Sequence, residues 1–277
     1  MTELTLTDQQ KLGLEILKDV HDFCVSDGIK YSVAYGSMIG AIRHNGFIPW
    51  DDDVDIIMPR PDYERFCREF RSDEYELICR STDPDCTIAY ARVADCKKTI
   101  CDPKVPWCSR QVGMWIDVFP VDAVPDDKVL YGKRFKALTN LWERTVWERQ
   151  ARTPLNTYGW QPVPTLKLIL KKLLFLNGIG LFRHVDRLIA QGQEIEWGST
   201  SHFAQLSCLD GRADKEYIPV RCFDSCVDVK FEDTVVKVLS GYEEVLSTMY
   251  GDYRQLPPPE KQIPHNNVLN KWYWKPE

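Results

Sequence analysis

The chain has 277 residues, of which 44% are hydrophobic and 12% aromatic, which suits a large domain with a substantial core and argues against disorder. Its formal net charge of -6 argues against a general nucleic-acid binder, since such a protein normally carries a basic face. No nucleic-acid partner is therefore expected.

Ten cysteines are many for a chain whose first residues are polar and acidic and lack the apolar run of a signal peptide. We therefore expect a cytoplasmic protein whose thiols are reduced and mostly buried as small hydrophobes. Zinc is the alternative, because Cys96, Cys101 and Cys108 are spaced C-x4-C-x6-C and Cys222 and Cys226 follow C-x3-C. Neither spacing is the paired C-x2-C of structural zinc sites.

The N-terminal segment predicts a helix that is followed by a strand. Thr7-Asp8 is the expected N-cap, apolar residues follow at helical spacing, and Gly28 supplies the C-terminal break. Residues 31–35 then predict a strand that ends at Gly36-Ser37, with a short helix over residues 38–44. A glycine between a strand and a helix lets backbone N–H groups approach an anionic ligand closely.

After Gly46 comes an acidic segment in which four carboxylates fall within five residues: Asp51, Asp52, Asp53 and Asp55. Such a cluster is repulsive unless a cation or solvent screens it. In an extended chain Asp51, Asp53 and Asp55 share one face. Since Mg²⁺ prefers oxygen ligands, usually one or two carboxylates plus substrate phosphate, the segment predicts a metal-dependent phosphoryl-transfer site.

The next predicted elements are a helix over residues 62–70, with Pro61 in its first turn, and strands over 75–79 and 88–93. Residues 115–119 form an apolar strand pattern with Asp117 in the middle. A lone buried aspartate is costly unless it is paired or metal-bound. Pairing with an arginine or capping a turn is the alternative to a catalytic role for this residue.

Residues 126–197 predict helices, interrupted at Pro154, at Pro162-Pro164 and at Gly178-Gly180. The stretch 166–181 is very apolar with interspersed lysines, yet it is too short and too basic to span a membrane. Packing on the core with snorkelling lysines is favoured, and peripheral contact with a membrane surface is the alternative. Towards the end, a strand over 231–239, a helix over 242–250 and an aromatic terminus at 272–274 that packs back are expected.

Several readings of the acidic segment compete. A surface loop explains the charge but not the flanking apolar residues, and an EF-hand fails because position six would be Ile56 rather than glycine. A haloacid-dehalogenase motif would need an apolar strand before it, whereas a glycosyltransferase Asp-x-Asp stays open. A strand ending in Gly-Ser, a helix, then Asp-x-Asp with a later third carboxylate is the nucleotidyltransferase pattern, and Asp117 fits the third place.

The stretch YGSMIGAIRHNGFIPWDDDVDIIMPRPDYERF resembles the opening motif of the LicD family, the phosphorylcholine transferases that decorate bacterial lipopolysaccharide and teichoic acids. WIDVFPVDAVP and YGDYRQLPPPEKQIPH are similar to its second and C-terminal motifs, and fukutin-related proteins carry a segment like the first. The resemblance implies an α+β fold, a nucleotidyltransferase-like mixed β-sheet flanked by helices. It implies one domain over 1–277, with a helical insertion at 126–214.

The same resemblance implies the ligands and the site. Asp53 and Asp55 would bind the metal with Asp117 as third carboxylate and Asp51 as a further ligand, and Gly36-Ser37 would be the phosphate loop. The metal would be one or two Mg²⁺ ions, with Mn²⁺ as an alternative. The donor would be a CDP-alcohol such as CDP-choline, and the acceptor a glycan or lipid-linked glycan.

Residues outside these motifs are weaker candidates. As phosphate partners we consider Arg43, Lys98 and Arg92, and as further polar groups His44 and His265. A choline head group would suit an aromatic cage, for which the candidates are Trp50, Trp107, Trp115, Tyr90 and Tyr250. The remaining alternatives are an enzyme that adds a nucleotide from NTP, and a non-catalytic protein that binds a nucleotide or glycan.

Overall fold

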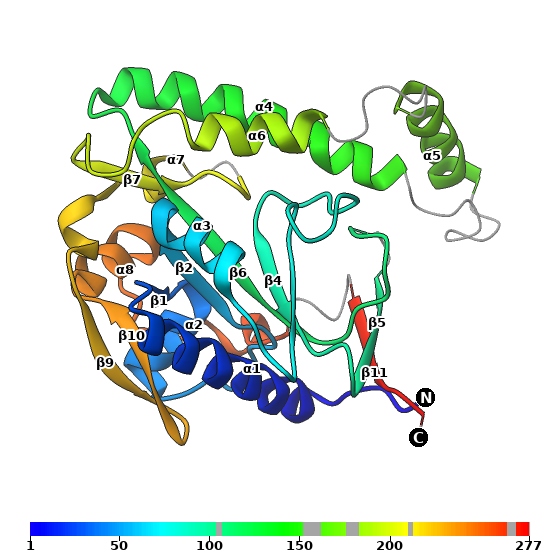
Figure 1. The fold of residues 1–277 in the computed structure, drawn as a ribbon, viewed down its shortest axis with the longest axis horizontal. Helices are drawn as coiled ribbons and strands as arrows, with labels where there is room; N and C mark the ends of the chain where they lie inside the picture. The colour runs from blue at the N-terminus through cyan, green and yellow to red at the C-terminus, as the bar shows by residue number, and fades with distance from the viewer. Residues whose placement is uncertain (104–106, 152–161, 176–182, 210–212, 265–269, 277) are drawn as a thin grey trace.

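The computed structural model describes residues 1–103, 107–151, 162–175, 183–209, 213–264 and 270–276 (Figure 1). Its helices are α1 (Leu6–Asp27), α2 (Tyr35–Ile39), η1 (Gly40–His44), α3 (Arg60–Glu69), α4 (Lys128–Ala151), α5 (Pro162–Phe175), α6 (Arg183–Gly192), α7 (Ala213–Glu216), η3 (Val220–Phe223), α8 (Tyr242–Tyr250) and η4 (Pro259–Lys261). Its strands are β1 (Ser32–Val33), β2 (Asp55–Pro59), β3 (Glu76–Ile78), β4 (Ala91–Ala94), β5 (Thr99–Pro103), β6 (Trp115–Val124), β7 (His202–Gln205), β8 (Ile218–Pro219), β9 (Cys226–Phe231), β10 (Thr234–Leu239) and β11 (Asn270–Trp274).

A seven-stranded mixed sheet organises the molecule. Its main path is β1-β2-β6-β4-β3, and β7 and β8 extend it from β6. The pairing of β2 with β6 is parallel and the other pairs in this sheet are antiparallel. Strand β6 is buried along its length except at half-buried Asp117, which is the near-continuous apolar run of a strand covered on both faces. The predicted α+β class and mixed sheet are confirmed.

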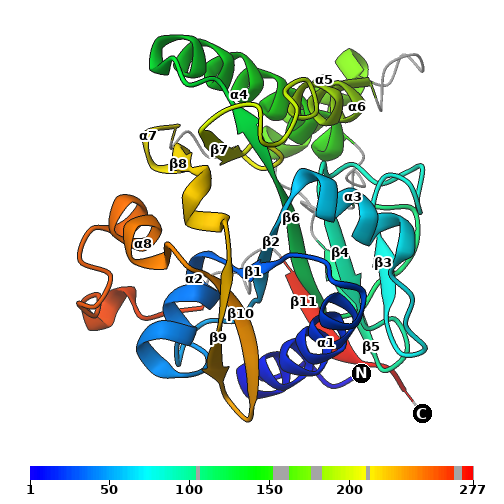
Figure 2. The same cartoon turned by 60° about the vertical axis from the view of Figure 1, so that its left-hand side comes forward.

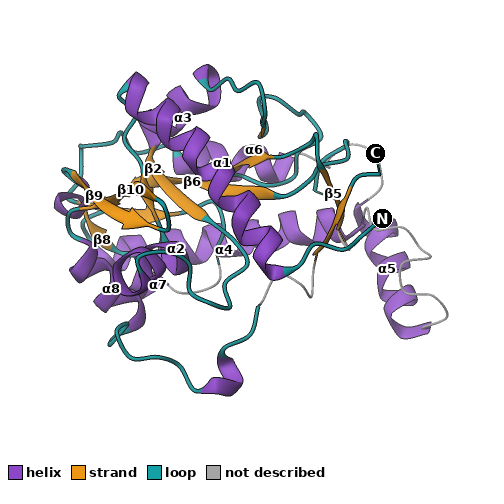
Figure 3. Cartoon of the chain, turned by 90° about the horizontal axis from the view of Figure 1, so that it is seen from below, coloured by secondary structure: helices purple, strands orange, loops and turns teal. Residues whose placement is uncertain are grey.

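Helices cover both faces of this sheet, with α1 and α3 on one side and α2 and α8 on the other (Figure 3). Helix α1 begins earlier than predicted, because Thr5 rather than Thr7 is the N-cap. The Thr5 hydroxyl accepts from the backbone N–H of Asp8, whose carboxylate accepts from the N–H of Thr5. Gly28 ends the helix in the left-handed conformation, as predicted.

Helix α3 is fixed to the centre of the sheet by a buried ion pair. Arg60 donates from Nε and Nη2 to the two carboxylate oxygens of Asp122, at 2.6 and 2.8 Å. Asp122 lies within β6, which runs on to Val124 and is longer than the predicted 115–119 strand. The bidentate pair holds β2, α3 and β6 in one arrangement.

The strand predicted at 231–239 is the second half of a hairpin. Strands β9 and β10 turn at Glu232, which adopts a left-handed φ of 53°. The hairpin lies beside β1, where the Ser32 hydroxyl accepts from the Leu239 N–H at 2.9 Å. Strand β9 was not predicted, although Val227, Val229 and Phe231 alternate with Asp228 and Lys230 as in a half-buried strand.

Helices α4, α5 and α6 form a layer at the end of the sheet to which β6 points (Figure 1). They match the predicted helical stretch, although Pro154 and Gly178-Gly180 lie outside the described residues. Within the range 126–214 the chain also returns to the sheet as β7. Among the described residues, no helix combines the length and apolar character needed to cross a bilayer.

The two ends of the chain lie side by side (Figure 2). Strand β11 pairs with β5, and the Leu4 N–H donates to the Trp272 carbonyl at 2.8 Å. Trp272 is buried, with its ring 5.3 Å from that of Trp115. The prediction that the aromatic terminus packs back is confirmed.

Candidate functional site

The parallel pairing of β2 with β6 brings two aspartates together. Asp55, the first residue of β2, is directly opposite Asp117 in the register. The backbone N–H of Asp117 donates to the carbonyl of Val54 at 2.9 Å, which fixes the two strands just where the carboxylates stand. Residues 62 positions apart in the sequence thus share one point on the sheet.

The segment that enters β2 adds three more carboxylates. Asp51, Asp52 and Asp53 each offer a carboxylate oxygen, and these oxygens lie within 4.8 Å of one another. Gln10 of α1 donates to the Asp51 carbonyl at 2.9 Å, so the segment is held by the helix that covers the sheet. Among the described residues this is the one group of three acidic, histidine or cysteine side chains close enough to share a metal ion.

The electrostatics of these carboxylates indicate a place for a cation. Burial raises the pKa of Asp55 well above its usual value, and the charges of Asp53, Asp117 and Asp51 raise it further. Burial also raises the pKa of Asp117, against the opposing effect of Arg92. Carboxylates that disfavour one another's charge in a partly buried site fit a hard, oxygen-liganded cation such as Mg²⁺.

Asp53 is the common neighbour in this group, since its charge acts on both Asp55 and Asp117. The predicted metal residues Asp51, Asp53, Asp55 and Asp117 therefore lie together. Asp52, to which no role was given, joins the cluster through Asp51 and Asp53.

Gly36 and Ser37 lie in the first turn of α2, and the strand before them is only Ser32–Val33, shorter than predicted. A Cβ on Gly36 would stand 2.5 Å from Oδ2 of Asp51, so only glycine fits beside this carboxylate. The Ser37 hydroxyl accepts from the Asp55 N–H at 3.0 Å. Both residues thus position the carboxylates, a contact that the sequence pattern did not reveal; their role as a phosphate loop stays a prediction.

Arg92 of β4 is the ion-pair partner of Asp117. Its Nε donates to Oδ1 of Asp117 at 2.6 Å and its Nη2 to the Tyr90 hydroxyl at 3.1 Å. Its guanidinium lies 4.3 and 4.2 Å from the ring centroids of Trp107 and Trp115. Two tryptophans considered for a choline cage therefore stack on a cation of the protein itself.

The other predicted phosphate partners contact other parts of the chain. Arg43 donates to the Tyr253 carbonyl at 2.6 Å and to Nε2 of His44 at 2.9 Å, which joins η1 to the segment after α8. Lys98 follows β4, with its ammonium 3.5 Å from a carboxylate oxygen of Glu15 on α1. His265 lies outside the described residues.

Three aromatic rings pack together near the strands that carry the paired aspartates. The ring of Phe119 on β6 lies 4.5 Å from that of Tyr90 and 5.9 Å from that of Tyr35. Tyr35 begins α2 with a left-handed φ of 48°. Burial raises the pKa of its hydroxyl, and the charges of Glu216 and Asp55 raise it further. Of these three rings, the sequence had suggested only Tyr90, because the other two look like ordinary core residues.

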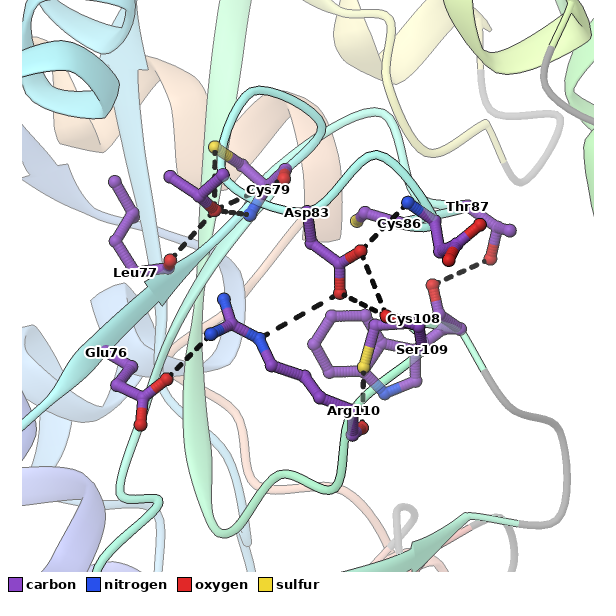
Figure 4. A network of polar contacts seen from close by, with 12 residues as sticks. Glu76, Leu77, Cys79, Asp83, Cys86, Thr87, Cys108, Ser109 and Arg110 are labelled. Atoms are coloured by element: carbon purple, nitrogen blue, oxygen red, sulfur yellow. Dashed lines mark hydrogen bonds and ion pairs between the residues drawn. The ribbon is translucent and has the colours of Figure 1, made fainter.

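All ten cysteines are free thiols. Near β3 and β4, the Cys108 thiol donates to the Arg110 carbonyl at 3.2 Å in the polar network of Figure 4. The Cys86 thiol donates to the Ile88 carbonyl at 3.8 Å. Since the described residues place no three thiols around one point, Cys96, Cys101 and Cys108 do not form the zinc site considered from their spacing.

The comparisons with known proteins agree with the predicted family. Residues 28–159 match the family described as "LicD/FKTN/FKRP, nucleotidyltransferase domain". Over 274 residues the chain is 35% identical to the lipopolysaccharide cholinephosphotransferase LicD of Haemophilus influenzae, covering 96% of this chain and 97% of that protein. A 116-residue part, 40% of each chain, is 33% identical to an uncharacterised protein of Rickettsia prowazekii. With a match over almost its whole length, the chain belongs to the LicD family.

Proposed function

We propose that this protein is a transferase that moves phosphocholine, or a related phospho-alcohol, from a CDP-linked donor to a hydroxyl of a cell-surface glycan precursor and releases CMP. CDP-choline is the first candidate donor. The observation that carries the proposal is the register pair of Asp55 and Asp117 beside Asp53, in a chain that matches a lipopolysaccharide cholinephosphotransferase almost end to end. The fold would be of the nucleotidyltransferase type that the family description names.

The residues present fit one or two Mg²⁺ ions, with Mn²⁺ as an alternative. Asp53 and Asp55 would hold the metal together with Asp51 and Asp117, because these carboxylates repel one another without it. A bound ion supplies charge neutralisation for the phosphate oxygens of the donor. The chain's own residues provide the positioning, on which phosphoryl transfer chiefly depends.

Asp117 would either complete the set of metal ligands or, instead of that, accept the proton. The acceptor hydroxyl would attack the phosphorus that carries the alcohol, the bond from that phosphorus to the CMP oxygen would break, and the hydroxyl proton would pass to a carboxylate. Burial raises the pKa of Asp117, against the opposing charge and hydrogen bond of Arg92, and a raised pKa favours uptake of a proton. Arg92, held between Trp107 and Trp115, would keep that carboxylate in place.

The acceptor would be a glycan or a lipid-linked glycan, and we propose that the cytoplasmic protein meets it at the inner membrane surface. Helix α5 supports this: five apolar side chains are exposed on it, namely Val163, Leu166, Ile169, Leu170 and Leu173. At 100° per residue they fall on one face, with exposed Lys167 beside it. The prediction that this helix packs on the core holds only in part. Leu168 is buried, whereas the face formed by the five apolar side chains is exposed to solvent.

The direct test is to incubate the protein with Mg²⁺, a choline-free lipopolysaccharide and, in separate reactions, CDP-choline, other CDP-alcohols, CTP or a UDP-sugar. We expect CMP release and product labelling with one CDP-alcohol. Pyrophosphate release from CTP would instead identify a nucleotidyltransferase, and UDP release a glycosyltransferase. Binding without turnover in every arm would identify a non-catalytic binding protein.

A further inference from the structure

A polar pocket lies at the opposite end of β6 from the clustered aspartates. Its volume is about 450 Å³, within the range of about 300–1,000 Å³ that small-ligand sites occupy. Helix α7 and strand β8 line it, between the start of α4 and helix α8 (Figure 2). Its polar side chains come from four elements: Lys128 of α4, His202 of β7, Asp214 of α7, and Glu244 and Thr248 of α8.

Contacts among the residues of the pocket fix its walls. The Tyr217 ring stacks on that of His202, with the ring centroids 4.0 Å apart, and lies 4.7 Å from the ring of Tyr131. The Tyr131 hydroxyl donates to a backbone carbonyl of α7 at 2.9 Å. On α8, both carboxylate oxygens of Glu244 accept from Nη2 of Arg221, at 2.7 and 2.8 Å. Aromatic and charged groups from several elements therefore stand at fixed positions around one space.

The lining favours an uncharged ligand that is rich in hydroxyl groups. Carboxylates accept hydrogen bonds and an ammonium group donates them, so Asp214, Glu244 and Lys128 suit sugar hydroxyls, which can do both. The two carboxylates would repel a nucleotide diphosphate, and burying these charges against a lipid chain would be costly. The rings of Tyr131 and Tyr217 add an apolar wall for the carbon-bound hydrogens of a sugar ring. A saccharide meets all of these requirements.

An apolar crevice lies between this pocket and the aspartates. Ile57 lines the crevice, and it is on the same face of β2 as Asp55, two residues further along the strand. The crevice is also lined by Glu216 and Ile218, which flank Tyr217 of the pocket in the sequence. The pocket and the crevice therefore adjoin along α7 and β8, on the way to the aspartates.

The length of β6 sets the size of a ligand that reaches both places. Val124, which is seven residues beyond Asp117, pairs with His202 of the pocket. Seven residues of extended strand span about 23 Å, which is more than one sugar unit covers. Such a ligand must therefore be an oligosaccharide rather than a monosaccharide.

We infer that this pocket binds a sugar unit of the acceptor glycan, remote from the unit that receives the phospho-alcohol. The inference rests on the proposed transfer to a glycan, and it identifies the part of the chain that selects the acceptor. Substitutions in the pocket should therefore change the affinity for the acceptor and leave nucleotide binding at the aspartates intact.

Gly132 offers a substitution that fills the pocket without removing a contact. It is an exposed lining residue of α4, and nothing lies within 4 Å of a Cβ added to it. Calorimetry would compare the wild type, Gly132→Trp and Lys136→Trp, the last at an exposed position one turn further along the helix. The probes are the oligosaccharide that mild acid releases from choline-free lipopolysaccharide and, separately, CDP with Mg²⁺. We expect Gly132→Trp to bind the oligosaccharide at least about tenfold more weakly, Lys136→Trp to match the wild type, and all three to bind CDP equally.

Asp214→Ala decides the question if Gly132→Trp does not fold. Loss of a hydrogen bond to its carboxylate predicts about tenfold weaker binding of the oligosaccharide, with the affinity for CDP unchanged. Equal oligosaccharide affinity of the wild type and the folded variants would overturn the inference, as would failure of the wild type to bind the oligosaccharide. Weaker binding of CDP alone would also overturn it, because the pocket would then hold the nucleotide. Since no product is measured, failure of the proposed transfer would leave this result readable.

Discussion

Burying the carboxylates of Asp55 and Asp117 costs folding free energy. They stand side by side on parallel strands, both are partly withdrawn from water, and burial is the first cause that raises the pKa of each. A raised carboxylate pKa means that the folded state disfavours the ionised form. Gathering negative charge at one point of the site therefore lowers the free energy of unfolding of the protein.

This stability cost predicts how the Asp55→Asn variant behaves in the absence of metal. The ionisation cost at Asp55 is absent below the unfolded-state pKa near 3.8 and is complete above the higher folded-state pKa. Asp55→Asn should therefore raise the Tm at pH 8 in EDTA, by about 2–4 °C per kcal/mol relieved, and the gain should shrink as the pH falls towards 4. Calorimetry at several pH values measures the difference in Tm between Asp55→Asn and wild type. Mg²⁺ should make this difference smaller, because it should stabilise the wild type. A lower Tm for Asp55→Asn at pH 8 would contradict it.

Gly36→Ala tests how closely the backbone must approach Asp51. The added Cβ would stand 2.5 Å from Oδ2 of Asp51, so that carboxylate has to move. We expect Mg²⁺ affinity to fall by about 10- to 100-fold, the range for displaced groups around a metal. Gly132→Ala is the control, because nothing lies within 4 Å of its added Cβ. Calorimetric titration with Mg²⁺ compares them, and equal affinities would rule out this role for Gly36.

Much of the site at this scale could be predicted from the sequence. Charge density and spacing pointed to Asp53 and Asp55, and an isolated carboxylate in an apolar strand pointed to Asp117, because both features are unusual in a chain that must fold. The hydrogen bond that the Asp55 N–H donates to the Ser37 hydroxyl could not be predicted. It depends on which strands and helices meet, and local pattern carries no such information.

At the scale of elements, the β9–β10 hairpin supports the acidic segment from a distance. Glu232 at its tip accepts from the Phe47 N–H at 3.0 Å, and the Glu232 N–H donates to the Asn45 carbonyl at 2.8 Å. A Cβ on Gly46 would meet the Glu232 carboxylate at 2.0 Å, so a glycine is needed where the loop passes the turn. The hairpin thus fixes the chain between η1 and the aspartates.

Glu232→Ala should remove that restraint. One lost hydrogen bond is worth about 1 kcal/mol, which predicts a Tm lower by about 2–4 °C together with slower transfer. Glu232→Gln keeps an oxygen acceptor and should stay close to wild type. Thermal unfolding and a transfer assay on the same preparations check this, and identical behaviour of the alanine and glutamine variants would show that the contact does not matter.

Long elements with a regular apolar spacing were predictable, and short ones were harder to recognise. Helix α1 was expected from its apolar spacing, whereas β9, with only three alternating apolar residues, was missed. Strand β1 was overpredicted because its flanking residues are apolar, although the chain turns into α2 at Tyr35. Tertiary context decides such boundaries.

At the scale of the whole molecule, the exposed face of α5 predicts binding to a lipid surface. Leu170 and Leu173 are 51% and 67% exposed, and burying each in a membrane should contribute about 1.5–3 kcal/mol. The double variant Leu170→Glu, Leu173→Glu should therefore bind phosphatidylglycerol vesicles at least about tenfold more weakly in a flotation assay. Val129→Glu with Leu130→Glu, at exposed positions on α4, is the control. Vesicle binding unchanged by the α5 variant, or absent in wild type, would exclude this surface.

Metal-assisted transfer at the clustered aspartates is the central proposal for this protein. The most direct measurement is the Mg²⁺-dependent rate of phosphocholine transfer from CDP-choline to lipopolysaccharide by wild type, Asp53→Asn and Asp228→Asn, the last at an exposed aspartate of β9. Since groups that only support metal ligands are worth 10- to 100-fold, loss of Asp53 should lower the rate by at least about 100-fold. EDTA should abolish wild-type activity, and Asp228→Asn should match wild type. Turnover at the wild-type rate in Asp53→Asn, or in EDTA, would contradict it.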